Sequence, residues 1–78
     1  MDERTLDTFK PSMKGRIKKI EEEGALRRRL FDMGITLSAE IVMRKSAPLG
    51  DPIEIVVRGY ELAIRKDIAK KIVVEVIE

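Results

Sequence analysis

Apolar and polar residues alternate over most of the chain beyond Gly34, which is the pattern of half-buried β-strands. Four segments show it, each with its apolar residues on one face. These residues are Ile41 and Met43, then Ile53, Ile55 and Val57, then Tyr60, Leu62 and Ile64, and finally Ile72, Val74 and Val76. The Arg58-Gly59 pair between the second and third segments indicates a two-residue hairpin turn, in which the glycine supplies a positive φ.

A further strand is expected over residues 15–20, before this alternating region. Its apolar residues Ile17 and Ile20 do not alternate cleanly. A β-bulge, which adds one residue to a strand, would place both on the same face. The segment from Pro48 to Pro52 must then be a loop between two strands.

Between residues 24 and 33 the apolar spacing changes to that of a helix. Leu26, Leu30 and Met33 fall at positions i, i+4 and i+7, so we expect one helical face with these three residues in the core. Gly34 follows at the place where helices commonly close in the left-handed conformation. The sequence therefore predicts one α-helix over about residues 24–33.

The predicted elements add up to a mainly β fold in a single domain spanning residues 1–78. It has five to six short strands, one α-helix and a short helical turn at about residues 66–70. Residues 1–13 are interpreted as an extended lead-in. A small, partly open barrel lets each short strand bury one face while protecting most sheet edges. An edge that stays open would also allow a weak homodimer.

Composition excludes most catalytic chemistry, because the chain has no cysteine and no histidine. Disulfides, thiolate metal sites, Ser-His-Asp triads and Cys-His pairs are thereby excluded. Carboxylates could still hold a hard cation. However, Glu21-Glu22-Glu23 do not converge in either a helix or a strand, and Asp51 near Glu54 is better explained as an aspartate that caps its own turn. We therefore predict no enzymatic activity, no metal site and no cofactor.

The sequence also argues against insertion into a membrane. Its longest unbroken run of apolar residues is three, whereas a membrane-spanning helix needs about twenty. No apolar stretch of the kind found in signal peptides follows the first residues. Together with the absence of cysteine, this predicts a cytosolic protein.

A cluster of basic residues raises the question of nucleic-acid binding. Arg27-Arg28-Arg29 lie in the predicted helix, where successive residues step by about 100°, so they cannot all face one partner. Arg28 can instead pair with Asp32 one turn further on. The net charge is only +2 and the aromatic residues number one tyrosine and two phenylalanines, too few for a stacking platform. We therefore predict no nucleic-acid partner.

Three blocks of the sequence, in their order and spacing, carry a resemblance to a known family. The blocks run from Gly24 to Ile35, from Ala47 to Pro52 and from Val57 to Arg65, and the stretch from Ile72 to Glu75 agrees as well. Taken together they resemble the ferrous-iron transport protein A (FeoA) family over about residues 5–76. The chain departs from the family near Ser12, where glycine is usual, and at Leu37-Ser38, where a Pro-Gly pair is usual. These serines predict turns with either a negative φ or a strained backbone.

The resemblance implies an SH3-like small β-barrel with a helix packed across it. It also implies a cytosolic accessory of bacterial ferrous-iron uptake, whose partner is the membrane ferrous-iron transporter with a cytosolic GTPase domain. The same module occurs as the C-terminal domain of iron-dependent repressors. A free-standing, metal-responsive sensor module is therefore the alternative function, and nucleic-acid binding comes third.

We therefore expect a non-enzymatic regulatory adaptor that docks on the cytosolic, GTPase-containing part of the transporter. Two surfaces are predicted to make the contact. One is the exposed face of the predicted helix, with Arg27 and Arg28. The other is the loop of Leu49, Gly50 and Asp51, since an apolar residue at a loop tip favours a contact with a partner.

Overall fold

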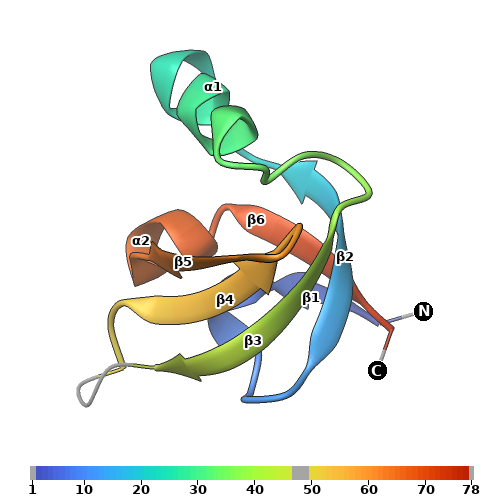
Figure 1. The fold of residues 1–78 in the computed structure, drawn as a ribbon. Coiled ribbons are helices and arrows are strands. Elements are labelled where there is room, and N and C mark those ends of the chain that lie inside the picture. The colour runs from blue at the N-terminus through green and yellow to red at the C-terminus, as the bar shows by residue number, and fades with distance from the viewer. Residues whose placement is uncertain (1, 47–49, 78) are drawn as a thin grey trace.

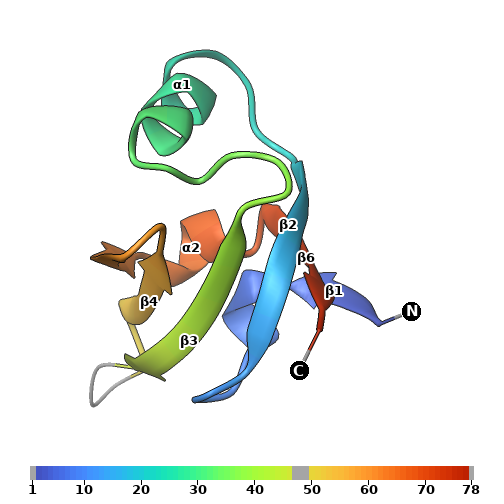
Figure 2. The same ribbon diagram turned by 45° about the vertical axis from the view of Figure 1, so that its right-hand side comes forward.

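The fold is built on one six-stranded antiparallel sheet, seen in a computed structural model that describes residues 2–46 and 50–77. Its elements in chain order are β1 (Glu3–Thr5), the 3-10 turn η1 (Leu6–Thr8), β2 (Lys14–Ile20), α1 (Gly24–Asp32), β3 (Glu40–Ser46), β4 (Ile53–Val57), β5 (Tyr60–Ile64), α2 (Lys66–Ala69) and β6 (Ile72–Val76). The strand order is β1-β6-β2-β3-β4-β5, so β1 and β5 are the two edges. The sheet curls into a small, partly open barrel (Figures 1 and 2).

The core fills the inside of this barrel with the side chains that the alternating pattern pointed inward. Ile53, Ile55 and Val57 of β4 are at most 1% exposed, as the period of two predicts. Ile72 and Val74 of β6 are equally buried. Tyr60 is different, because it comes directly after the hairpin turn and remains 69% exposed. Its predicted place on the buried face of β5 was wrong.

The irregular apolar spacing in β2 has the cause that the sequence predicted. The register between β2 and β6 shifts between Ile17 and Lys19, so the strand contains a bulge at Lys18. Ile17 and Ile20 consequently share the buried face, with exposures of 1% and 4%.

The first thirteen residues are more structured than the expected extended lead-in. Residues 3–5 form strand β1, which pairs with β6, and the chain then makes the turn η1. Leu6 and Phe9 are buried in the core at 0% and 4% exposure. The N-terminal segment therefore covers one side of the barrel. A strand of only three residues is too short for its apolar periodicity to predict this.

Helix α1 ends within one residue of its predicted position. The N–H of Met33 donates to the carbonyl oxygens of Arg29 and Leu30, and Gly34 follows with φ +96°. Only part of the predicted apolar face is covered: Leu30 is buried, Leu26 is half-buried and Met33 is 39% exposed. The prediction of Met33 as a core residue was wrong, because α1 lies at one end of the barrel instead of across it (Figure 1).

The tight turns show which of the two serine alternatives holds. Ser12 and Ser38 have φ values of +76° and +70°, in the left-handed region that favours glycine. Arg58 and Gly59 also have positive φ values, +51° and +82°, which confirms the two-residue hairpin. The short helix α2 confirms the helical turn expected near residue 66. Within residues 2–46 and 50–77, no helix has the length and apolar character required to cross a membrane.

Candidate docking surface

Arg27 does not project freely from α1 as expected, but is held against the molecule. Its Nη1 donates a hydrogen bond to the carbonyl oxygen of Ile20 at 3.0 Å. Its guanidinium carbon lies 4.9 Å from the centre of the Phe31 ring, a cation–π distance. The side chain therefore ties the helix to the end of β2 and leaves Arg28 and Arg29 as the exposed cations of the helix.

Two open hollows share Arg27 in their lining. The larger, about 510 Å³, is lined by Lys19, Ile20 and the run Glu21-Glu22-Glu23. The smaller, about 300 Å³, is lined by Gly24, Arg28 and the half-buried ring of Phe31. This end of the molecule thus places the half-buried Phe31 ring beside arginine side chains, and aromatic residues and arginine are enriched at protein interfaces.

The acidic run beside α1 does not converge on one point. Glu21 pairs with Lys19 at 3.4 Å, whereas Glu22 pairs with Lys71 at 3.2 Å. Across the described part of the chain, no three acidic side chains gather where they could hold a metal ion. The predicted pair between Arg28 and Asp32 is also absent from the ion pairs of the described residues, and both side chains are exposed.

Apolar side chains are exposed beside the C-terminal end of α1. Met33 and Leu37 are 39% and 49% exposed. Arg58, at the tip of the β4–β5 hairpin, fastens the segment between them: its Nη2 donates to Thr36 Oγ1 at 2.6 Å and its Nε donates to the Gly34 carbonyl at 3.4 Å. Sequence reasoning missed Leu37 as a surface residue, and the departure from the family's Pro-Gly pair at this turn was the signal available.

The second predicted surface lies elsewhere on the molecule. Gly50 and Asp51 precede β4, at the end of the barrel opposite α1 (Figure 1). Asp51 does not cap its own turn as expected; its Oδ1 accepts a hydrogen bond from the main-chain N–H of Lys66 at 2.9 Å and so ties this loop to α2. Leu49 lies outside the described residues. The structure therefore does not bring the two predicted surfaces together.

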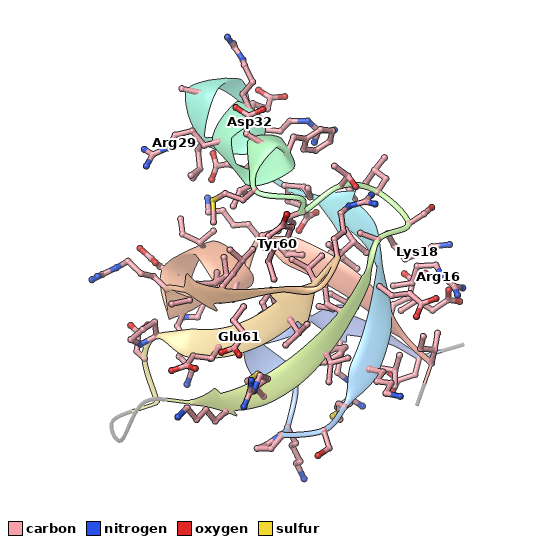
Figure 3. The ribbon with its side chains drawn as sticks, in the orientation of Figure 1. Arg16, Lys18, Arg29, Asp32, Tyr60 and Glu61 are labelled. Carbon is pink, nitrogen blue, oxygen red and sulfur yellow. The ribbon has the colours of Figure 1, made fainter. Side chains whose placement is uncertain are left out.

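The outer face of the sheet carries paired charges. Arg16 contacts Glu40 at 3.3 Å, and Arg44 contacts Glu61 at 2.7 Å. Figure 3 shows Arg16 and Lys18 near each other on the outer side of β2, and Glu61 in front of the sheet. Because acidic partners neutralise part of the basic residues, this face lacks the uninterrupted positive potential that binds phosphates.

Known proteins are similar to this chain in sequence and in fold. A family model described as the FeoA domain matches residues 4–76. An Fe(2+) transport protein A/Fe(2+) transporter FeoB fusion protein of Porphyromonas gingivalis is 34% identical over 61 residues, which cover 78% of the chain and 7% of that protein. The chain therefore spans only a small part of this curated relative.

Solved structures of FeoA proteins have a similar fold. The FeoA-like protein from Clostridium acetobutylicum is 38% identical, with a TM-score of 0.90 over 100% of this chain and 91% of that one. Zinc-complexed FeoA from Stenotrophomonas maltophilia, described as a prokaryotic SH3 domain protein, is 25% identical, with a TM-score of 0.79 over 91% of this chain and 88% of that one.

The likeness extends in fold alone to a more distant class. A manganese-dependent transcriptional repressor, solved with manganese, is 16% identical, with a TM-score of 0.88 over 99% of this chain and 38% of the repressor. The barrel described above is thus an SH3-like fold shared between two classes of protein. The sequence match over residues 4–76 decides between them: this chain belongs to the FeoA family.

Proposed function

We propose that this protein is a non-enzymatic, cytosolic accessory of ferrous-iron uptake that docks on the GTPase-containing part of the ferrous-iron transporter. The observation that carries the proposal is the Porphyromonas gingivalis relative, in which a related domain and the transporter FeoB form one polypeptide. A covalent link raises the effective concentration of one partner at the other, often to the millimolar range, so fusion favours pairs that bind each other.

The docking surface that we propose is the end of the molecule formed by α1. Arg27 holds the helix in place through the Ile20 carbonyl, and Arg28 offers an exposed cation beside the hollow that Phe31 lines. Met33 and Leu37 add exposed apolar area at the other end of the helix. Aromatic, apolar and arginine side chains in one region are typical of the energetically important centres of protein interfaces.

The loop of Gly50 and Asp51 is the second contact that we propose, together with Leu49. Because it lies at the opposite end of the barrel, a partner that reached both surfaces would have to extend along the whole domain. Leu49→Ala changes only this loop and leaves the α1 surface unchanged, so the binding affinity of this variant tests the second contact separately.

A titration of the isotope-labelled chain with the isolated GTPase domain, followed by NMR, tests the proposal. We expect resonances of α1 and of residues 33–37 to shift. Arg28→Glu and Leu37→Ser should each weaken binding by about fivefold or more, with little change in melting temperature because both side chains are exposed. Lys18→Glu is the matched control, an exposed charge reversal on the outer side of β2 that should bind normally.

The outcomes separate two errors. If neither variant weakens binding while the unmodified chain binds, the surface is wrong and the adaptor function stands. If the unmodified chain has no affinity for the GTPase domain, the adaptor function itself is refuted. The metal-sensor alternative would instead require saturable shifts on addition of Mn²⁺ or Fe²⁺ at the carboxylates of Glu21 to Glu23, Asp51 or Glu54.

A further inference from the structure

The edge strand β5 presents main-chain hydrogen-bonding groups that nothing in the sheet uses. In a two-residue hairpin, Val57 and Tyr60 exchange both main-chain bonds across the turn. Bonded and non-bonded pairs then alternate along the ladder, so the N–H and C=O groups of Glu61 and Ala63 point away from β4. Both residues are exposed, and among the described residues no turn, loop or cap hydrogen bond involves their main chain.

Lysine, proline and a β-bulge, three of the features that commonly protect a sheet edge, are missing from β5. Natural edges are blunted by lysine, proline, bulges or very short strands. Tyr60 to Ile64 contain no lysine and no proline, and the pairing with β4 shows no register shift. The other edge, β1, has only three residues. The open edge of the barrel is therefore concentrated at β5.

We propose that β5 pairs antiparallel with β5 of a second copy of this chain, with Leu62 opposite the partner's Leu62. In this register Glu61 faces the partner's Ala63, and two-fold symmetry repeats the pair. The outward-pointing groups of the two strands therefore satisfy one another completely.

The neighbouring registers fail for identifiable reasons. Centring the pair on Glu61 would place two carboxylates directly opposite each other, which is destabilising. Centring it on Ala63 would require the Arg65 carbonyl oxygen, which already accepts hydrogen bonds from the N–H groups of Ile68 and Ala69. The register centred on Leu62 remains.

Side chains support the same register. Leu62, which is half-buried in the single chain, packs against the partner's Leu62. Tyr60, which is 69% exposed, faces the partner's Ile64, and aromatic–β-branched pairs across strands are stabilising. On the other face, Glu61 forms an ion pair with Arg44 of its own chain at 2.7 Å and lies opposite the partner's Ala63, which is uncharged, so no like charges meet across the two strands. A second copy therefore complements this edge in both main chain and side chains.

Proline at Ala63 tests the pairing, because a proline on the outward side of an edge strand is tolerated by the fold but cannot donate to a new strand. The matched control is Glu3→Pro on the other edge. The N–H of Val76 donates to the Asp2 carbonyl oxygen, so the alternation along β1 points the N–H of Glu3 outward in the same way.

Sedimentation equilibrium and amide hydrogen exchange of the full chain, from micromolar to millimolar concentration, give the readout. We expect the unmodified chain to self-associate, and the Glu61 and Ala63 amides to exchange more slowly as its concentration rises. The association constant should be at least about tenfold lower in Ala63→Pro. Glu3→Pro should show no such loss. Exchange at these two amides that is independent of concentration overturns the proposal, even if Ala63→Pro fails to fold. So does a folded Ala63→Pro chain that associates normally. Protection that appears only when the transporter's GTPase domain is added would assign the edge to that partner and likewise refute self-pairing.

Discussion

Replacing Gly15 with alanine should destabilise the protein, even though alanine is the better residue for a strand interior. A Cβ atom at this position would overlap Val74 Cγ1 and lie 2.8 Å from both the Glu75 carbonyl oxygen and Phe9 Cζ. The φ angle of Gly15 is not among the positive values, so the backbone itself accepts an L-residue. Gly15→Ala therefore sets steric overlap directly against conformational entropy.

The magnitudes decide the sign. Removing the extra freedom of glycine in the unfolded chain favours alanine by about 0.5–1 kcal/mol. Overpacking a dense core costs about 1–3 kcal/mol, and the upper value applies here because one of the three neighbours is backbone and cannot rotate away. The net loss is about 2 kcal/mol. For a domain of this size each kcal/mol moves the melting temperature by about 4–8 °C, so a fall of about 8–16 °C is expected.

Thermal and urea unfolding measure this loss. Val74→Ala removes one of the overlapping atoms, so the double variant should lose less stability than the two single variants combined. Gly59→Ala is a control without steric overlap, since a Cβ atom at Gly59 would have no neighbour within 4 Å and only the φ of +82° opposes the change. A Gly15→Ala chain as stable as the unmodified protein would refute the packing argument.

Three further predictions concern stability. Ser12→Gly and Ser38→Gly should each raise the free energy of unfolding by about 0.5–1 kcal/mol in urea titrations, because glycine relieves the left-handed backbone; a loss of stability would contradict this. Asp51→Ala should cost about 1 kcal/mol by removing the acceptor for the Lys66 N–H, and amide exchange at Lys66 should quicken; unchanged exchange there would disprove the anchoring role. Leu30→Ala should cost about 2–5 kcal/mol in thermal unfolding because Leu30 is only 3% exposed, and a cost below about 1 kcal/mol would mean that α1 is not anchored through this side chain.

Local periodicity was enough to predict the strands that bury a full face. Ile53, Ile55 and Val57 alternate because β4 lies between two neighbours with its inner side in the core. The bulge in β2 could also be predicted, because in a regular strand Ile17 and Ile20 would point to opposite faces. Strand β1 could not be predicted from local sequence, since its pairing with β6 joins residues at opposite ends of the sequence.

For the candidate surface, too, local patterns predicted some features, whereas contacts between distant residues could not be predicted. Periodicity indicated which face of α1 is apolar but not how far the barrel covers it, so Met33 was misplaced. The hydrogen bonds of Arg27 with the Ile20 carbonyl and of Lys66 with Asp51 connect residues seven and fifteen positions apart, and no local pattern encodes them. The sequence named useful residues, whereas their distribution over two ends of the barrel depends on topology.

The two ends of the described chain lie beside each other, and this has a consequence for how the domain can be attached to other proteins. The N–H of Val76 donates to the Asp2 carbonyl oxygen at 2.8 Å, and both ends leave the barrel away from α1 (Figures 1 and 2). A domain whose ends are adjacent can be joined to, or inserted into, a longer polypeptide without disturbing its fold. A linker attached at either end would therefore leave the barrel on the side away from α1. The α1 surface would stay exposed and able to contact the protein to which the linker is attached.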